Sequence, residues 1–397
     1  MTDTVPTVPP APDMQMPAPG ELWLSDRPEL HALLYEARRR IASPWALLAA
    51  AISRSLLTIP YRVRYRSDLH PEGTPLNLAQ SLVGRSGAGK STAIRGAACA
   101  VTFVGEDVPE TAHARSGEAI ATMLGRVQSA KDAEPELVYT RSDHAVWLHW
   151  DEVGQLAQQG DRTGSTMLET VKSVMSGETL GGQNAKGDGV TIPAGSYRAV
   201  LTLGVQPRRA APLLSEGAIA GGLAARFVWL AAEDPDAAAA PRPEGEQRAV
   251  QVTLHQWDAV RFVEALPIMN AAHEADTRAA HRGEREPIHS RLLLNRAIIA
   301  IALANMAGRA HLIPEDWHLA GAVTAHSLET LDAVADALAE PDDAELERVQ
   351  RLEQRMRKRM AEQQAAGLTY QEARRNLSNP QGKLLTELVG AGKFAPW

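Results

Sequence analysis

A glycine-rich stretch offers the clearest chemistry in this sequence. It matches the pattern G-x-x-x-x-G-K-S/T in full and lies between an apolar strand pattern and a helical one, which is the context that this motif requires. Glycines let backbone N–H groups curl around a β-phosphate, and the N-terminus of the following helix favours the anion. Lys90 is expected to reach the β- and γ-phosphates of ATP, and the Ser91 hydroxyl to bind Mg²⁺. The residues expected to hold the nucleotide are Gly84, Arg85, Ser86, Gly87, Ala88, Gly89, Lys90, Ser91 and Thr92.

An acidic pair supplies the second half of such a site. Asp151 and Glu152 directly follow the apolar run 145–150, which we expect to be a buried strand. Ligands of α/β sheets bind beyond the carboxyl ends of the strands. We therefore expect Asp151 to be a metal ligand that holds the hydration shell of Mg²⁺, and Glu152 to orient and deprotonate the attacking water. The alternative is a solvated helix start, where acidic residues are also favoured.

Strand and helix patterns around these motifs predict an α/β fold. Short apolar runs separated by helical stretches are typical of a mostly parallel sheet. The expected strands are 61–65, 76–83, 100–104, 145–150, 197–204 and 227–230. Helices are expected at 45–57, after Pro44, and at 291–307, with Ser290 as its N-cap and Gly308 as its stop.

Composition along the chain predicts six parts. They are a disordered arm at 1–20, a helical N-terminal element at 21–60, the ATPase core at 61–235, a linker at 236–247, a helical lid at 248–340, and a charged helix with a winged helix at 341–397. For the last segment, a solvated helical hairpin is an equal alternative. An apolar stripe on the charged helix is interpreted as a packing face rather than a coiled coil; its members are Leu346, Val349, Leu352, Met356 and Met360.

The overall charge and the single cysteine narrow the function classes. A net charge of −7 weighs against a protein that coats nucleic acid over its whole surface, but it permits a ring whose basic groups line a channel. Cys99 alone excludes an internal disulfide framework and fits a reducing compartment. The start of the chain has no signal-peptide pattern, and the best apolar run, 297–304, is too short for a membrane span. We therefore expect a cytoplasmic protein without a membrane partner.

Two later stretches carry a family resemblance. Residues 175–193 are polar and rich in glycine and precede the strand 197–204 with Gln206-Pro207, and G-G-L-A-A-R-F-V-W-L follows at 221–230. This order resembles AAA+ helicases of the minichromosome-maintenance type. There, a β-hairpin carrying a lysine precedes a strand that ends in a sensor Asn-Pro, and a Ser-Arg-Phe motif opens the last strand. Residues 75–233 also resemble the helicase-like ATPases that phages, plasmids and integrated elements encode beside primase-polymerase modules.

The resemblance implies roles for four further residues. Gln206 would be the sensor that hydrogen-bonds the γ-phosphate or the water; Gln replaces the family's Asn here, which leaves a RecA-like core as the alternative. Arg226, preceded by Ala225 instead of Ser, would be an arginine finger for a neighbouring subunit. Lys186 would contact DNA phosphates from the hairpin tip, and Arg291 would be a second sensor at the nucleotide. The plainer alternatives are a strand cap for Gln206, a solvated loop for Lys186, and an ion pair within its own subunit for Arg226.

Two functions from different classes fit this set. The first is an ATP-driven helicase or translocase that serves replication of a mobile element. It would form a homo-oligomeric ring, for example a hexamer, on single-stranded or forked DNA, with a primase-polymerase as partner. The second is a nucleotide-gated AAA+ switch of a defence or regulatory system that acts on a protein partner. A small-molecule kinase is disfavoured by the acidic pair and the large helical extension.

Overall fold

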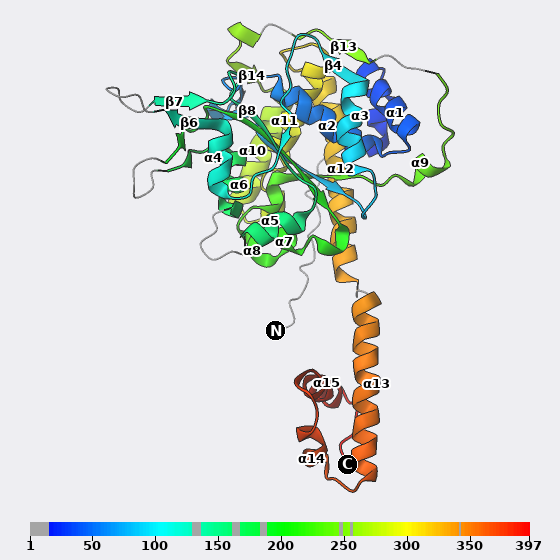
Figure 1. Ribbon diagram of the computed structural model, residues 1–397. Helices are drawn as coiled ribbons and strands as arrows, with labels where there is room; N and C mark the ends of the chain where they lie inside the picture. Colours follow the sequence, from blue (N-terminus) through cyan, green and yellow to red (C-terminus); the bar gives the residue numbers. More distant parts are fainter. Residues whose placement is uncertain are drawn as a thin grey trace. The chain divides into compact units, whose positions relative to one another are not determined.

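Five parallel strands form the centre of the larger of the chain's two units, Met1–Leu338 (Figure 1). Their order is β12-β3-β11-β8-β5, and every neighbouring pair is parallel. The α/β expectation with a parallel sheet is therefore confirmed. In this computed structural model the described residues are 16–128, 136–160, 167–182, 189–245, 249–254, 257–340 and 343–397. The strands are β3 (Leu78–Val83), β5 (Thr111–Ala112), β8 (Ala145–Trp150), β11 (Arg198–Val205) and β12 (Phe227–Ala231).

The path of the chain through this sheet creates a crevice. From β3 the chain passes to β5 at one edge, returns through β8 and β11, and then crosses β3 to reach β12 at the other edge. The connections that follow β3 and β11 therefore leave in opposite directions, although the two strands are neighbours. Such a switch point is where open α/β sheets bind their ligands, at the carboxyl ends of the strands.

Helices cover both faces of the sheet, so the strands are buried on both sides. Alternate residues of β3 belong to opposite cores, with Leu78 and Leu82 in the first and Ala79 and Val83 in the second. The first face is covered by α1 (Pro28–Arg40), α2 (Pro44–Leu57), α3 (Lys90–Ala100) and α11 (Leu292–Met306). The second is covered by α4 (Gly117–Leu124), α5 (Val153–Gly160), α6 (Met167–Ser176) and α7 (Ala211–Leu214).

The helices expected to form a lid are part of this core. Helix α11 is apolar almost all round and packs against α2, and both belong to the first core. The segment Pro287–Met306 is long and apolar enough to cross a membrane by length and composition, which the sequence analysis did not expect, but 72% of that window is buried inside the protein. The N-terminal helices and the expected lid thus share one unit with the sheet.

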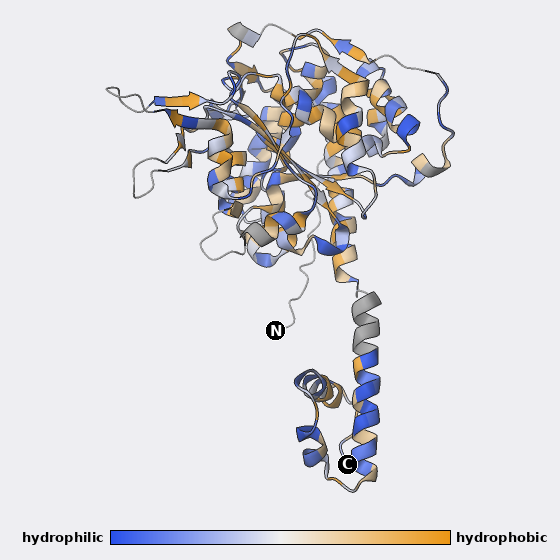
Figure 2. Cartoon of the chain, viewed as in Figure 1, coloured by the Kyte–Doolittle hydropathy of each residue, from blue (hydrophilic) through white to orange (hydrophobic). Residues whose placement is uncertain are grey.

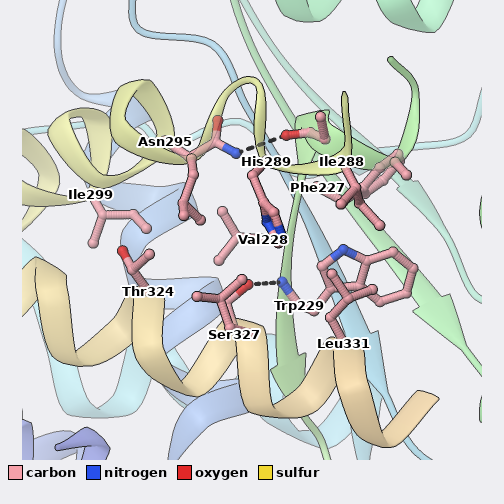
Figure 3. Close-up of a pocket in the computed structure, with 14 residues that line it drawn as sticks. Phe227, Val228, Trp229, Ile288, His289, Asn295, Ile299, Thr324, Ser327 and Leu331 are labelled. Atoms are coloured by element: carbon pink, nitrogen blue, oxygen red, sulfur yellow. Dashed lines mark hydrogen bonds between the residues drawn. The ribbon is translucent and has the colours of Figure 1, made fainter. Parts of the chain in front are cut away.

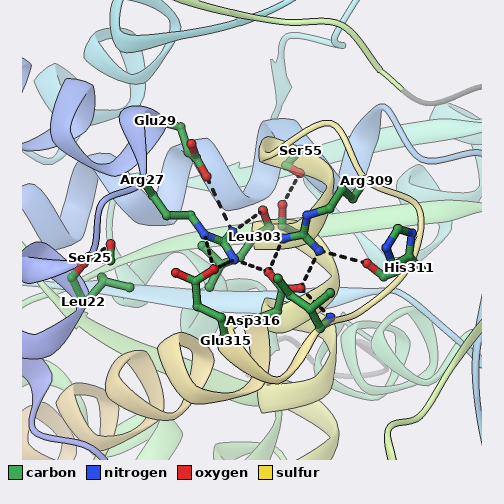
Figure 4. A network of polar contacts seen from close by, with 12 residues as sticks. Leu22, Ser25, Arg27, Glu29, Ser55, Leu303, Arg309, His311, Glu315 and Asp316 are labelled. Carbon is green, nitrogen blue, oxygen red and sulfur yellow. Dashed lines mark hydrogen bonds and ion pairs between the residues drawn. The ribbon is translucent and has the colours of Figure 1, made fainter.

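A buried ionic network joins the two ends of this unit (Figure 4). Arg27, just before α1, lies 2.5 Å from Asp316 and 2.9 Å from Glu315 in α12 (Pro314–Ala339). Arg309 binds the other oxygen of Asp316 at 2.8 Å. Because Asp316 is fully buried, its charge depends on these two arginines.

Helix α12 also closes one edge of the sheet. The backbone N–H of Trp229 donates to Ser327 Oγ at 2.8 Å, and that of Ala231 donates to His326 Nε2 at 3.2 Å. Figure 3 shows the first of these bonds beside a cavity between β12, α11 and α12. This cavity of about 20 Å³ has room for about one water molecule. We therefore interpret it as a packing space.

Smaller sheets and hairpins surround the central sheet. The run 61–65 corresponds to β1, which lies between β14 and β2, and the run 100–104 corresponds to β4, which pairs with β13; neither strand joins the central sheet. The bounds are β1 (Arg64–Ser67), β2 (His70–Pro75), β4 (Val101–Phe103), β6 (Gly125–Gln128), β7 (Glu136–Tyr139), β9 (Leu180–Gly181), β10 (Thr191–Ile192), β13 (Val250–Val252) and β14 (Phe262–Glu264). The remaining helices of this unit are η1 (Pro19–Leu24), η2 (Pro207–Arg209), α8 (Glu216–Ala220), η3 (Ala224–Arg226), α9 (Pro235–Ala239), η4 (Trp257–Ala259), α10 (Pro267–His281) and η5 (Pro287–His289).

The second unit, Ala339–Trp397, is helical. It consists of α13 (Asp343–Ala365), α14 (Tyr370–Arg375) and α15 (Asn379–Gly390). Residues 343–397 are all described and contain no strand, so the β-wing of the expected winged helix is absent from them. Met356 and Met360 are buried against α14 and α15, as expected for a packing face.

Candidate functional site

The glycine-rich loop between β3 and α3 forms a cradle for an anion. Gly87 and Gly89 have φ angles of +85° and +81°, which glycine adopts without strain, and open space surrounds both Cα atoms. Gly89 is also the N-cap of α3, which begins at Lys90. The first N–H groups of a helix have no partner within the helix, and the positive end of the helix dipole lies there. The loop therefore offers several N–H donors to one negatively charged group.

Lys90 places its ammonium group inside this loop. Its Nζ donates to the carbonyl oxygens of Gly84 at 2.7 Å and Arg85 at 2.9 Å. Partial burial lowers the pKa of Lys90, while the carboxylates of Glu152, Glu233 and Asp151 act in the opposite direction. A bound phosphate would take over the carbonyl contacts and give this cation an anionic partner.

The acidic pair lies at the carboxyl end of β8, where Glu152 meets a residue of the neighbouring strand. Gln206, just after β11, donates from Nε2 to Glu152 Oε1 at 2.8 Å. The other oxygen, Oε2, is 3.6 Å from Nη1 of Arg209. The structure thus brings together two residues that the sequence assigned to catalysis. It adds Arg209, which the sequence analysis missed because an arginine in a polar turn carries no motif.

Gly204 of β11 lies between Asp151 and Lys90 and is close to both. A Cβ atom on Gly204 of β11 would lie 1.9 Å from the Asp151 carbonyl oxygen and 3.4 Å from Lys90 Cε. Only a residue without a side chain therefore allows the loop and the acidic pair to lie this close together. The Asp151 side chain accepts a 3.2 Å contact from His149 Nε2, and His149 Nδ1 lies 2.9 Å from Thr202 Oγ1.

Glu233 contacts the glycine-rich loop from β12, which lies on the side of β3 away from β11. It follows β12, and its Oε1 accepts from the backbone N–H of Arg85 at 2.5 Å and from the Arg85 Nε at 3.0 Å. Partial burial acts to raise the pKa of Glu233, but these hydrogen bonds from Arg85 hold it below its ordinary value. The ionised carboxylate of Glu233 thereby holds Arg85, the second residue of the glycine-rich loop, in place.

Arg226 and Arg291 lie at the opposite end of the sheet. Arg226 precedes Phe227, which pairs with Ala79 in the amino-terminal half of β3, whereas the glycine-rich loop follows the carboxyl end of that strand. Arg226 Nη2 and Arg291 Nη1 both donate to Ser176 Oγ, at 3.1 and 3.4 Å. Arg291 therefore lies away from the glycine-rich loop of its own chain, and its role as a second sensor stays a prediction.

In the described part of the chain these two arginines form a cationic pair with no acid in direct contact, although the charges of Glu178 and Glu169 act on Arg226 and that of Glu178 acts on Arg291. Among the described residues, no carboxylate oxygen lies within 4 Å of either guanidinium, so the ion pair considered for Arg226 is not formed. Burial and, to a smaller extent, the neighbouring Arg226 lower the pKa of Arg291 to about 10, while the charge of Glu178 acts in the opposite direction. The Nε atoms of both residues are buried without a hydrogen-bond partner. A planar guanidinium group without an ion-pair partner can bind a phosphate or carboxylate of another molecule.

A hairpin precedes β11, as the resemblance implied. Strands β9 and β10 pair antiparallel, and Lys186 belongs to the connecting residues 183–188, which lie outside the described residues. A second hairpin, β6–β7, was not expected. A Cβ atom on Gly125 of β6 would lie 3.2 Å from Ile192 Cδ1 of β10, so the two hairpins pack side by side.

No protein-family model matches the chain, and no curated protein is significantly similar to it in sequence.

Proposed function

We propose that this chain is a P-loop ATPase that works as an oligomeric DNA helicase or translocase in the replication of a mobile genetic element. One observation carries the proposal. The glycine-rich loop, the acidic pair and Gln206 follow three adjacent parallel strands and meet at one edge of the sheet. Chains that hydrolyse nucleoside triphosphates need this combination of phosphate cradle, metal ligand and base.

The donor set at this edge suits a magnesium nucleotide. The loop N–H groups and Lys90 match the charge of the β- and γ-phosphates, and the glycines leave space for them. The Ser91 hydroxyl and the Asp151 carboxylate are the hard oxygen ligands that Mg²⁺ prefers, and the side chain of Asp151 is well exposed. When bound, Mg²⁺ neutralises part of the phosphate charge.

Glu152 is the general base in this proposal. The amide of Gln206 fixes Oε1, so Oε2 remains to accept a proton from a water molecule. Arg209 Nη1 lies 3.6 Å from Oε2 and places a positive charge beside this oxygen. The base is thus held in one orientation by residues of the neighbouring strand and the turn after it.

The cationic pair Arg226 and Arg291 supports assembly into an oligomer. In a strand such as β12, residues advance by about 3.3 Å each, so its amino end cannot reach the loop at its carboxyl end. The pair would therefore serve the γ-phosphate of a neighbouring copy, as an arginine finger supplied in trans does. A homo-oligomeric ring, for example a hexamer, satisfies this requirement at every interface.

The test of the chemical part is ATP turnover in three forms of the protein. Glu152→Gln should bind ATP and hydrolyse it at least about 10²-fold more slowly, the usual scale for a lost general base. Lys90→Ala should lose most of its nucleotide affinity, because the phosphate charge loses its cation. Unchanged turnover in Glu152→Gln would show that the base lies elsewhere.

The test of the DNA part is the same assay with single-stranded DNA added. We expect stimulation that weakens from low to physiological salt, because phosphate contacts depend on counterion release. Lys186→Ala should lose most of the stimulation and keep the basal rate. If no form of DNA changes the wild-type rate at low salt, the nucleotide-gated switch acting on a protein partner replaces the helicase.

A further inference from the structure

The C-terminal part of the second unit is basic, although the whole unit, residues 339–397, is nearly neutral, with ten Lys and Arg against nine Asp and Glu. Residues 351–397 contain nine Lys and Arg against four Asp and Glu, a net charge of +5 in a chain whose net charge is −7. All nine cationic residues are exposed. In Figure 2 the coloured residues of α13 are mostly hydrophilic. A segment of this size with a net charge of +5 attracts polyanions at close range.

Part of this charge forms a ridge on α13. Arg351, Arg355 and Arg359 are spaced by four residues and therefore lie on one face of the helix. Like charges at this spacing cost about 0.2–0.5 kcal/mol per pair, so the arrangement does not serve helix stability. Among the described residues, no carboxylate lies within 4 Å of the Arg355 or Arg359 guanidinium, whereas Arg357 on another face pairs with Glu353 at 2.7 Å.

Helices α14 and α15 form a helix-turn-helix against α13. Residues 376–378 connect them, and capping boxes at Thr369 and Ser378 define where the two helices begin. Arg374 Nη2 donates to Thr386 Oγ1 at 3.2 Å and ties the helices together. Their buried side chains pack on the two methionines of α13; they are Ala373, Leu385 and Leu388. Two short helices with a tight turn, held by a third helix, are the arrangement that places a helix in the DNA major groove.

The outer face of α15 has the chemistry for such a groove. Asn379, Lys383 and Thr386 are exposed and recur at helical spacing. Asn and Lys side chains near the start of a second helix are those that bind base edges and phosphates. The aromatic rings of this unit, in contrast, pack on one another: the Tyr370 and Trp397 ring centroids are 5.6 Å apart. Such rings do not form a stacking platform for single-stranded bases.

We propose that residues 351–397 bind double-stranded DNA, with α15 in the major groove and the arginine ridge of α13 on the phosphates. This binding needs neither ATP nor an oligomer, so it goes beyond the proposed ATPase and can fail or succeed independently of it. It would hold the chain on duplex DNA while the first unit acts on the nucleotide.

Fluorescence anisotropy of the full chain without ATP tests the proposal. The probes are a labelled duplex of about two helical turns and a single strand of the same length. Arg355→Ala/Arg359→Ala/Lys383→Ala should weaken duplex binding at least about tenfold and reduce the salt slope by about 0.9 for each lost phosphate contact. The matched control is Arg278→Ala/Arg282→Ala, two exposed cations of the first unit, which should bind as wild type.

A gain-of-charge variant makes the test independent of damage to the fold. Glu387 is exposed on α15, and Glu387→Lys should tighten duplex binding and steepen the salt slope by about 0.9. Both variants should keep the wild-type basal ATPase rate. Duplex affinity that neither variant changes, or a wild-type preference for the single strand over the duplex, overturns the proposal.

Discussion

Gly204 controls the geometry of the candidate site at the level of a single atom. An added methyl group would overlap the Asp151 carbonyl oxygen, so Gly204→Ala must push β8 away from β11. We expect a loss of about 1–3 kcal/mol in unfolding free energy, as for other overpacked sites, and at least about tenfold slower ATP hydrolysis. Urea unfolding and a turnover assay measure the two effects.

Gly154 is the matched control for this substitution. It lies in α5 close to the same edge, has a negative φ and faces open space. Gly154→Ala should leave turnover unchanged and stabilise the helix slightly, because alanine favours helices over glycine by about 1 kcal/mol. Equal effects of the two substitutions would mean that Gly204 has no special role at the site.

At the scale of elements, β12 places Arg226 at the end of the sheet opposite the glycine-rich loop of its own chain. Arg226→Ala should therefore abolish most ATP hydrolysis, by about 10³-fold if it acts like other arginine fingers. Mixing Arg226→Ala with Lys90→Ala chains should restore part of the activity, because mixed interfaces regain one complete site. Specific activity should also rise with protein concentration. A dilute monomer that hydrolyses ATP at the full rate with either arginine removed contradicts assembly in trans.

The ionic network of Figure 4 makes a second prediction at this scale. Asp316→Ala leaves Arg27 and Arg309 partly buried without their shared carboxylate, and we expect it to lower the unfolding free energy by about 3–5 kcal/mol. Glu315→Ala removes a partner of the same Arg27 whose side chain is 47% exposed, and should cost less than about 1 kcal/mol. Urea unfolding of both variants checks the difference, and equal losses would refute the role of burial.

For the whole molecule, two buried histidines make stability depend on pH. Burial lowers the pKa of His326 and that of His273 to about 4. Both are neutral in the fold, and His326 accepts the Ala231 N–H in that form. The unfolded chain binds protons at both near pH 6.5, so their contribution is complete above that pH and decreases as the pH falls toward 4.

We expect a loss of about 1 kcal/mol in unfolding free energy per histidine between pH 7.5 and 5.5. Urea unfolding at these two pH values measures it, and His326→Gln should reduce the difference. His31→Gln, at an exposed position, is the control and should leave the difference unchanged. Stability that does not change over this interval would show that the two histidines bind protons in the fold as readily as in the unfolded chain.

The sequence predicted the strands and turns whose pattern depends only on residues close together in the chain. The run 145–150 matches β8 to the residue, and 197–204 is displaced by one from β11, because strands buried on both faces appear as uninterrupted apolar runs. The positions of the glycine-rich loop after β3 and of the acidic pair after β8 could be predicted from motif and context. The sequence did not predict the hydrogen bond between Gln206 and Glu152, which forms because the two residues follow neighbouring strands.

The features that the sequence did not predict depend on contacts between residues that lie far apart in the chain. Strand β5 has two residues and carries no periodic signal, and β1 pairs with β14, which lies far along the chain. The place of Arg291 follows from how η5 and α11 pack against the sheet, which no local pattern specifies. One signal was available: α11 is apolar on all sides, and such helices are buried in a core.

The closed edges of the central sheet limit how copies of this chain can associate. At one edge, Ser327 and His326 occupy the outward N–H groups of β12, and at the other edge β5 offers only two residues for pairing. Neither edge can accept a strand from another molecule, which is the usual route to irreversible aggregates. Contacts between copies at these two edges must therefore be made by side chains, and contacts of this kind can break and form again without unfolding.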